Sequence, residues 1–248
     1  MKLTGNTILV TGGGSGIGRG LAEAFHKLGN KVIVAGRRKA NLADVVSANP
    51  GIDSVELDVS NPESIASVSK KLITKYPKLN VLLNNAGIML LDDVSKPIDD
   101  NLLTSQFETN LFGTVRMTSA FIEHLKTQKS GTVLNVSSVL GFVPMAFAAL
   151  YSSTKAGIHA YSMGLRYMLK GTSVEVQEIA PPWVQTDLLN SNEEPRAMPL
   201  KPFIEQTIEA LRTSDREVLV EIAKPYRANP GVYEAAFFHQ LNDSFAQG

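Results

Sequence analysis

The chain of 248 residues contains no cysteine, one tryptophan and four histidines. Without cysteine, disulfides and thiolate metal ligands are excluded, which fits a reducing compartment. The histidines are scattered and form no pair at metal-ligand spacing, so we predict no metal site. No stretch approaches the roughly 20 apolar residues that a membrane-spanning helix needs. Residues 1–6 have too few apolar side chains for a signal peptide, so we expect a cytoplasmic protein without membrane contact.

An excess of charge of either sign is also lacking, because 24 basic and 24 acidic residues cancel at pH 7. The chain therefore has no net basic field that would attract nucleic acid or an anionic membrane surface. Hydrophobic residues make up 44% of the chain and charged residues 19%, which is ordinary for a globular protein with a large core. The length suits one large α/β domain or two small ones.

Short apolar runs rich in β-branched residues alternate with amphipathic segments along the chain, and such runs are typical of buried parallel strands. We expect strands at Thr7–Thr11, Lys31–Ala35, Ile52–Leu57, Val81–Asn84, Thr132–Ser138, Val174–Ala180 and Glu217–Ile222. We expect helices at Ile17–Leu28, Lys39–Asn49, Pro62–Tyr76, Leu103–Thr127, around Tyr151 as far as Leu169, at Pro199–Thr213 and at Pro230–Leu241. The polar residues Asp187–Met198 are expected to form a mobile loop. This alternation predicts an α/β fold with a doubly wound, mainly parallel, seven-stranded sheet.

No repeat, low-complexity tract or linker divides the sequence. We therefore expect a single domain over residues 1–248, with a core at 1–180 and a C-terminal region with the substrate loop at 181–248.

A glycine-rich stretch, Gly12-Gly13-Gly14-Ser15-Gly16-Ile17-Gly18, joins the first expected strand to the first expected helix. Glycines there permit positive φ, let a pyrophosphate approach the backbone and let the helix pack close to the strand. The helix N-terminus offers free N–H groups and partial positive charge to a phosphate. Because the spacing differs from the G-x-G-x-x-G fingerprint, a glycine-rich turn without a ligand stays open as an alternative.

Tyr151 and Lys155 stand four residues apart in Tyr151-Ser152-Ser153-Thr154-Lys155, which places them on one face of a helix. A lysine charge beside a tyrosine favours the phenolate, so we expect the pKa of Tyr151 to fall below its usual value of about 10. Such a tyrosine can donate or accept a proton near neutral pH. The pentapeptide by itself is equally typical of a solvated helix face.

Four motifs occur in one order at the ends of expected strands or on the helix that follows: Thr11–Gly18, Asn84-Asn85-Ala86-Gly87, Ser138 and Tyr151-x-x-x-Lys155. In order and interval they resemble the classical short-chain dehydrogenase/reductase (SDR) family, over about residues 3 to 187. The resemblance implies a Rossmann-like domain. It also implies an oxidoreductase that transfers a hydride between a nicotinamide and an alcohol or carbonyl substrate.

The resemblance further implies a catalytic tetrad of Asn110, Ser138, Tyr151 and Lys155. Asn110 would hold a water in a proton relay, and Ser138 would polarise the substrate carbonyl. Tyr151 would be the general acid in reduction and the base in oxidation, with Lys155 lowering its pKa and binding the nicotinamide ribose. Ser137 is the rival for the serine role; Ser138 is preferred because the family places this serine thirteen residues before the tyrosine.

Cofactor contacts are implied at the strand ends. The pyrophosphate would contact Gly12, Ser15, Ile17 and Gly18, and the adenine would contact Asp58 and Val59. The adenine ribose would contact Asn85, Ala86 and Gly87, and the nicotinamide carboxamide would contact Val184 and Thr186. Asp58 could instead form a turn, and Thr186 could cap a helix. The family usually has Pro-Gly after the sixth strand. Pro182 replaces that glycine, which changes the backbone beside the nicotinamide because proline lacks an N–H and fixes φ.

The end of the second strand bears on the choice between NAD and NADP. Enzymes that prefer NAD place an acidic residue there, which accepts hydrogen bonds from the ribose hydroxyls. This chain has Gly36 at that point, followed by Arg37 and Arg38. A guanidinium can bind the 2′-phosphate of NADP through two parallel hydrogen bonds. We predict NADP(H), with NAD less favoured; two solvated surface arginines are the alternative.

Eight apolar residues near the site by family geometry predict a hydrophobic carbonyl or alcohol substrate, or else core packing: Val139, Leu140, Phe142, Val143, Met145, Phe147, Trp183 and Leu188.

Small residues recur at Ala156, Ala160 and Gly164 beside Gly157. The family commonly pairs this helix across a twofold axis, which implies a homodimer or homotetramer. A catalytically silent nucleotide-binding regulator is the alternative to an enzyme. An epimerase of the family's extended branch is disfavoured, because it would need a sizeable C-terminal substrate domain that we do not expect in this sequence.

Overall fold

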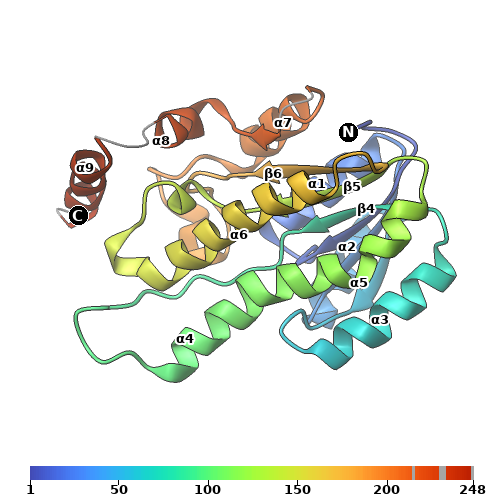
Figure 1. Ribbon diagram of the computed structural model, residues 1–248, viewed down its shortest axis with the longest axis horizontal. Coiled ribbons are helices and arrows are strands. Elements are labelled where there is room, and N and C mark those ends of the chain that lie inside the picture. Colours follow the sequence, from blue (N-terminus) through green and yellow to red (C-terminus); the bar gives the residue numbers. More distant parts are fainter. Residues whose placement is uncertain (214–215, 229–232, 247–248) are drawn as a thin grey trace.

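A computed structural model describes residues 1–213, 216–228 and 233–246 of the protein. Its centre is a seven-stranded sheet in the order β3-β2-β1-β4-β5-β6-β7 (Figure 1). The strands are β1 (Thr7–Thr11), β2 (Lys31–Gly36), β3 (Asp53–Glu56), β4 (Leu79–Asn84), β5 (Gly131–Val136), β6 (Val174–Ile179) and β7 (Glu217–Val218). All neighbouring pairs are parallel. The predicted α/β fold with seven strands is confirmed, and the sheet is wholly parallel.

Helices cover both faces of the sheet, which is the doubly wound arrangement predicted. One face is covered by α1 (Gly16–Lys27), α2 (Lys39–Ala48) and α7 (Leu200–Ala210). The other is covered by α3 (Pro62–Lys75), α5 (Gly113–Thr127) and α6 (Ala149–Met168). Figure 1 shows α5 and α6 side by side in front of the sheet.

The central strands are apolar throughout because both of their faces are buried. In β1, Ile8, Leu9 and Val10 have no exposed surface. Successive side chains of a strand point to opposite faces. Accordingly, Ile8 and Val10 pack with Phe25 of α1, whereas Leu9 packs with Phe121 of α5.

The helix expected over Leu103–Thr127 is divided into three parts, which corrects that prediction. It begins earlier, as α4 (Asp100–Gln106), passes through a π-helical segment, Phe107–Phe112, and continues as α5. Such insertions in α-helices are frequent at functional sites, because the extra residue changes where side chains point. Here the segment contains Asn110, which is fully buried.

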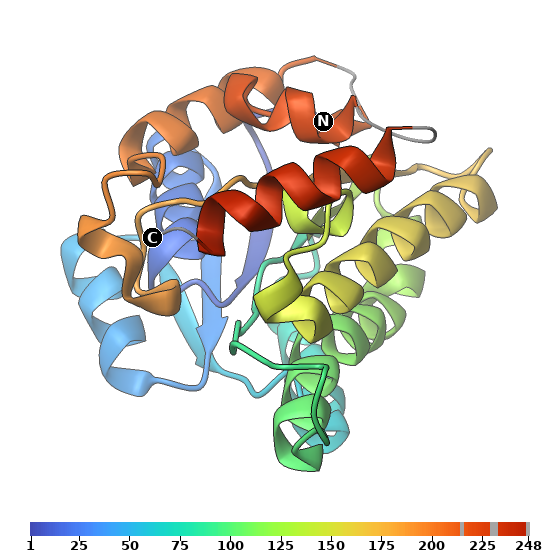
Figure 2. The ribbon, with the colours of Figure 1, turned by 90° about the vertical axis from the view of Figure 1, so that its left-hand side faces the viewer.

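The C-terminal region differs most from expectation. Strand β7 has two residues where Glu217–Ile222 was predicted, and a 3-10 turn (Glu221–Ala223) and α8 (Lys224–Arg227) follow it. The last helix, α9 (Glu234–Ala246), begins later than predicted, and residues 230–232 of that prediction lie outside the described residues. Figure 2 shows α9 crossing one end of the molecule near the segment before α6. Among the described residues, no helix combines the length and the apolar character that crossing a membrane requires.

Candidate active site

The glycine-rich turn lies where β1 meets α1, beside the end of β4. Gly12 and Gly16 have positive φ, of +64° and +52°, a conformation that residues with a side chain rarely adopt. The side chain of Ser15 caps no N–H of α1, so the N-terminal amides of this helix stay free for an anion. Asn85 donates from Nδ2 to the Thr11 carbonyl at 3.0 Å, which fastens the turn to the end of β4.

Gly18 is the point of closest approach in this turn. A Cβ added there would overlap the Gly12 carbonyl and the Asn85 side-chain amide. We expect Gly18→Ala to lower the free energy of unfolding by about 1–3 kcal/mol, because the rigid turn must move. Gly164→Ala is the matched control: a Cβ there meets nothing within 4 Å, and alanine should stabilise α6 by about 1 kcal/mol. Urea unfolding compares them, and equal stability of the two variants would contradict this account of the turn.

Tyr151 and Lys155 lie on the buried face of α6, 7% and 3% exposed. Lys155 Nζ donates to the Val136 carbonyl at 2.9 Å, at the end of β5. The same Nζ is 5.5 Å from the centroid of the Tyr151 ring. The alternative of a solvated helix face is therefore wrong for this pair.

The pKa values of this pair differ from the expectation based on sequence. Burial raises the pKa of Tyr151 to about 12, although hydrogen bonding with Ser138 opposes the rise. Burial lowers the pKa of Lys155 to about 8, against the field of Glu178, which raises it. The predicted fall in the Tyr151 pKa is thus wrong. Removal of the phenol from water disfavours the phenolate more than the neighbouring side chains favour it.

The two serines that follow β5 have different partners. Both line the cavity, but Ser137 Oγ donates to the Glu178 carboxylate, at 2.5 Å. Ser138 Oγ accepts from the Leu140 amide at 3.1 Å and donates to the Pro181 carbonyl at 3.5 Å. Of the two serines, Ser138 is the one that acts on the pKa of Tyr151.

Asn110 is held from several sides. Its Oδ1 accepts from the Ile88 amide at 2.8 Å, and its Nδ2 donates to the Ile88 carbonyl at 2.9 Å and to Thr154 Oγ1 at 3.2 Å. A Cβ placed on Gly87 would lie 3.4 Å from Asn110 Oδ1 and 3.7 Å from Lys155 Nζ. The segment after β4 therefore lies close to both Asn110 and Lys155.

A cavity of about 520 Å³ runs from the glycine-rich turn to Tyr151. It brings together most of the site residues predicted from sequence: Gly12, Ser15, Ile17, Gly18, Arg37, Arg38, Val59, Asn85, Ala86, Gly87, Ser138, Tyr151, Lys155, Val184 and Thr186. Asn110 and Asp58 are not in its wall. Asp58 Oδ1 instead accepts from the amide and hydroxyl of Ser60, as a turn-forming aspartate does.

The apolar residues predicted near the site divide into two groups. Five line the cavity: Val139, Leu140, Met145, Trp183 and Leu188. Phe142, Val143 and Phe147 do not: Phe142 packs its ring edge on His159 at 5.0 Å, Val143 is buried, and Phe147 is largely exposed.

Both arginines after β2 are exposed at one end of the cavity. Arg38 donates from its guanidinium to Ser15 Oγ at 2.7 Å, across to the glycine-rich turn. The sequence by itself offers both Arg37 and Arg38 for a phosphate. The contact places the Arg38 guanidinium next to the turn that offers free amides.

The segment after β6 is held by the residues that follow it. Val184 forms an isolated parallel bridge with Met198, and Trp183 Nε1 donates to Ser191 Oγ at 2.8 Å. Residues Leu188–Glu193, expected as a loop, form a 3-10 segment in which Leu189 and Asn190 have positive φ of 55° and 51°. Thr186 Oγ1 accepts from the amide of Leu188, the first residue of this segment, at 3.3 Å. Thr186 also lines the cavity, so both predicted positions of this residue are found.

Two cavity residues from the C-terminal region were missed, Tyr226 of α8 and Leu241 of α9. The next residue, Asn242, fastens α9 to the segment before α6: its Oδ1 accepts from the Ala146 amide at 2.5 Å, and its Nδ2 donates to the Pro144 carbonyl at 3.1 Å. These partners are almost 100 residues apart in sequence, and no local pattern indicates them.

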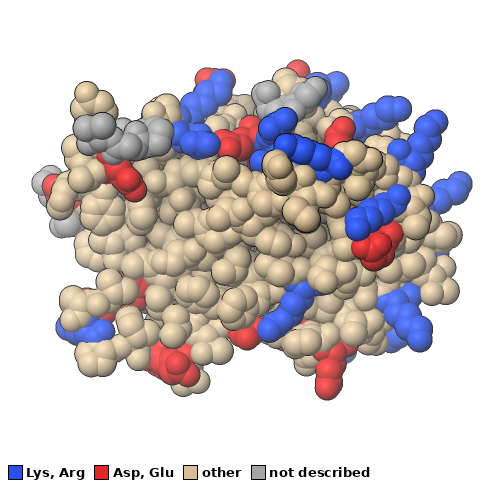
Figure 3. Space-filling view, in the orientation of Figure 1, with Lys and Arg blue, Asp and Glu red and all other residues tan. Residues whose placement is uncertain are grey.

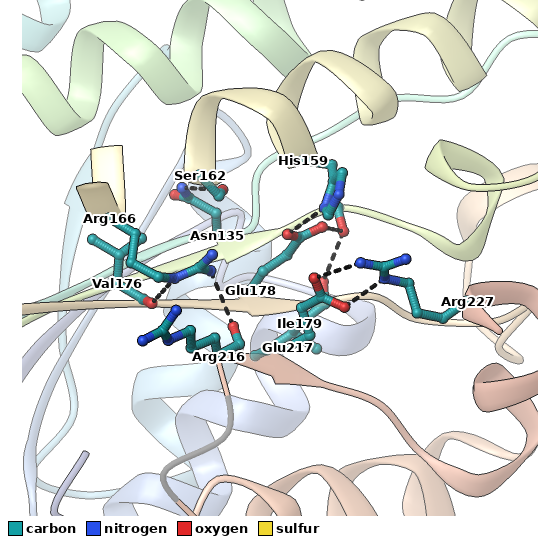
Figure 4. Close-up of polar contacts among 11 residues, drawn as sticks. Asn135, His159, Ser162, Arg166, Val176, Glu178, Ile179, Arg216, Glu217 and Arg227 are labelled. Atoms are coloured by element: carbon teal, nitrogen blue, oxygen red, sulfur yellow. Dashed lines mark hydrogen bonds and ion pairs between the residues drawn. The ribbon is translucent and has the colours of Figure 1, made fainter. Parts of the chain in front are cut away.

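A buried acidic residue, Glu178, was missed as well. It is fully buried in β6 (Figure 4), and the signal was an acid in a strand that the sequence predicts to be buried. Within residues 1–213, 216–228 and 233–246, no three His, Cys, Asp or Glu side chains gather as a metal site requires.

Comparisons agree with this geometry. A family model described as short chain dehydrogenase matches residues 6–197. An uncharacterized oxidoreductase of Bacillus subtilis (strain 168), DltE, is 34% identical to this chain. The alignment of 248 positions covers 98% of this chain and 98% of that protein.

Solved structures are similar over nearly the whole chain. A short chain dehydrogenase from Burkholderia cenocepacia J2315, in complex with NADP, has a TM-score of 0.85 at 28% identity, covering 98% of this chain and 99% of that one. A short chain dehydrogenase/reductase from Burkholderia phymatum, in complex with NAD, shares the fold with a TM-score of 0.82 at 21% identity, covering 92% and 93% of the two chains. With most of its length matched by the family model and a full-length relative at 34% identity, this chain belongs to the short-chain dehydrogenase/reductase family of oxidoreductases.

Proposed function

We propose that the protein is an NADP(H)-dependent oxidoreductase that interconverts a hydrophobic carbonyl compound and its alcohol. The observation that carries the proposal is that Ser138, Tyr151 and Lys155 lie together in the wall of the cavity that begins at the glycine-rich turn. Such a cavity joins an anion-binding turn to proton-donating side chains, which is what a reaction with a dinucleotide and a carbonyl requires. We take the chain as one domain.

The residues present fit a dinucleotide. Gly18 lets the start of α1 pack tightly against Gly12 and Asn85, and the first amides of α1 are free beside it. Asn85, Gly87, Val184 and Thr186 continue the wall toward Tyr151. When bound, the nicotinamide supplies or accepts the hydride.

The side chains of the protein supply orientation and protons. Ser138 donates a hydrogen bond to the substrate oxygen, and Tyr151 gives that oxygen a proton as negative charge develops on it. The positive charge of Lys155 favours loss of the Tyr151 proton. Asn110, held by Ile88, keeps the segment at Gly87 in place and orients a water next to Lys155.

NADP(H) is supported by Arg38, whose guanidinium bonds to Ser15 at one end of the cavity and could bind the adenosine 2′-phosphate of NADP. No acidic side chain stands at Gly36 to accept bonds from free ribose hydroxyls. A relative at 28% identity was solved with NADP. A hydrophobic substrate is supported by Leu140, Met145, Trp183 and Leu241 in the cavity wall.

A catalytically silent nucleotide-binding regulator on the same fold is the competing function, since fold alone does not determine activity. A panel of apolar ketones and aldehydes incubated with NADPH distinguishes the two, because turnover removes the absorbance of the reduced nicotinamide. The proposal expects oxidation of NADPH with at least one apolar carbonyl. NADPH binding without turnover on any of them would favour the regulator.

We also propose that the protein assembles as a homodimer or homotetramer through α5 and α6. On α6, Met163 and Tyr167 are 52% and 67% exposed, and Ala160 and Gly164 are exposed beside them. Figure 3 shows few charged side chains over the middle of this face, with most of them near its edges. Gly157, by contrast, packs on Leu111 of the same chain, so it belongs to the fold.

Light scattering at micromolar concentration tests this assembly, and we expect twice or four times the mass of one chain. Gly164→Arg should shift the protein toward monomers, because a bulky charge would then stand in the apolar face. A monomeric wild-type protein would contradict the proposal.

A further inference from the structure

Glu178 has an environment that calls for explanation. Its side chain has no exposed surface, and it lies in register with Asn135 at the end of the sheet where the cavity opens. A buried carboxylate is costly unless it is paired and hydrogen-bonded. Neither Glu178 nor its partner His159 lines the cavity, so any effect on the reaction must act through other residues.

The two carboxylate oxygens of Glu178 have different partners. Oε1 accepts from Ser137 Oγ at 2.5 Å, and Oε2 lies 2.8 Å from His159 Nδ1. Ser137 immediately precedes Ser138, and His159 follows Lys155 by one turn of α6. One carboxylate therefore ties the segment that carries Ser138 to the helix that carries Lys155.

The same cluster reaches the loop after Ser138. The ring of Phe142 meets His159 edge-on at 5.0 Å, and the Arg227 guanidinium lies 5.1 Å from the Phe142 centroid. Arg227 in turn forms two hydrogen bonds with Glu217, at 2.6 and 3.1 Å. Figure 4 shows Glu178 directed at His159, with Glu217 and Arg227 beside them.

The charge of Glu178 also acts on Lys155, whose pKa it raises against the effect of burial. The other charged groups that face this pair come from three elements: His159 and Arg166 of α6, Glu217 of β7 and Arg227 of α8. Glu217 acts on His159 and Arg166, whereas Glu178 is the group that acts on Lys155.

We propose that Glu178, with His159, is a positioning residue for the reaction: one buried carboxylate holds Ser138 in place against α6 and supplies the negative charge that faces Lys155. This inference rests on the proposed function, because it assigns Glu178 a part in that reaction. It goes beyond the tetrad by making the interior of the sheet, behind the cavity, a determinant of activity.

The first test is the pH profile of kcat/KM for NADPH oxidation, in Glu178→Gln against wild type. Lysine is charged below its pKa, and removal of a neighbouring negative charge lowers that pKa. The alkaline limb of the profile, where activity declines as the pH rises, should therefore lie at a lower pH in the variant. Glu217→Gln is the matched control, because Glu217 is a carboxylate of the same cluster but does not act on Lys155. In this control, the decline of kcat/KM at high pH should occur at the same pH as in wild type. An unmoved limb in active Glu178→Gln would overturn the inference.

The second test needs no activity. Hydrogen bonding to Glu178 raises the pKa of His159, so its ring should stay protonated above pH 6.5, the usual midpoint. In Glu178→Gln the midpoint should fall, because the hydrogen bond and the charge of Glu178 are lost while burial, which lowers this pKa, remains. NMR titration of the imidazole nitrogens, with His159→Asn to assign the signal, measures both. An identical midpoint in wild type and Glu178→Gln would contradict the pair.

The third test removes the hydrogen bond by which Glu178 holds the segment of Ser138, in a variant that should fold. Ser137→Ala keeps the charge of Glu178 and its contact with His159 but frees the segment of Ser138. We expect kcat to fall about 10-fold, since small displacements of reacting groups are costly, with an unmoved alkaline limb. Wild-type kcat in Ser137→Ala would overturn this part of the inference. Wild-type protein that turns over no carbonyl would instead remove the proposed function, while the NMR result would still stand.

Discussion

Replacement of Tyr151 by phenylalanine is expected to lower kcat for carbonyl reduction by about 10²–10⁴-fold, the usual contribution of a general acid. The ring stays in its buried place on α6, and only the hydroxyl is lost. The carbonyl oxygen then gains charge without a proton donor beside it, so the barrier rises. NADPH binding should survive, because the glycine-rich turn at the other end of the cavity is untouched.

Steady-state kinetics with one carbonyl substrate, together with NADPH binding followed by fluorescence, checks this expectation. Tyr161→Phe is the matched control: it makes the same change on the same helix, at a half-buried tyrosine outside the cavity. Its kcat should be that of wild type. If Tyr151→Phe kept most of its kcat, Tyr151 would not be the proton donor.

Wild-type protein is expected to prefer NADPH over NADH by about 10- to 1,000-fold in kcat/KM. One or two charge-assisted hydrogen bonds to the 2′-phosphate contribute about 1.5–3 kcal/mol each, and about 1.4 kcal/mol corresponds to tenfold. Gly36→Asp combined with Arg37→Ala should erase or reverse this preference, because a carboxylate repels the phosphate and accepts bonds from free ribose hydroxyls. A side chain is tolerated at Gly36, where an added Cβ would meet only Leu42, at 3.8 Å.

The structure adds a discriminating variant, Arg38→Ala. Since the Arg38 guanidinium reaches Ser15 and the turn, this change should reduce the preference more than Arg37→Ala does. Lys39→Ala is the control: this neighbouring cation pairs with Glu56 and lies outside the cavity, so the ratio should not change. A wild-type ratio near one, or one in favour of NADH, would contradict the assignment of NADP(H).

The order of elements could be predicted from the sequence because each signal is local. A strand buried on both faces needs an unbroken apolar run, as in Thr7–Thr11, and Asn61 before Pro62 fixes the start of α3 through its side-chain cap. The glycine-rich turn and the spacing of Tyr151 and Lys155 are local patterns too. The seven strands, the parallel sheet and the membership in the family followed from them.

Other features depended on residues that meet only in the folded chain. Burial reversed the expected shift of the Tyr151 pKa, because the loss of water around a side chain is set by all the elements packed on it. The π-helical segment around Asn110 has no known local signature, and its anchor at Ile88 lies 22 residues away. The same holds for the contact of Arg38 with Ser15 and for α9, which is fastened beside the cavity by Asn242.

Glu178 illustrates the division most clearly. In the sequence it is one of two acidic residues in Val174–Ile179, compatible with a solvated position like that of Glu175. Parallel pairing of β5 with β6 and the packing of α6 bring Ser137 and His159 to its two oxygens. The sequence by itself determined which residues carry the family's motifs, since those patterns are local. Only the tertiary structure decided which charges lie behind them, because an electrostatic field depends on distance in space and on exclusion of water.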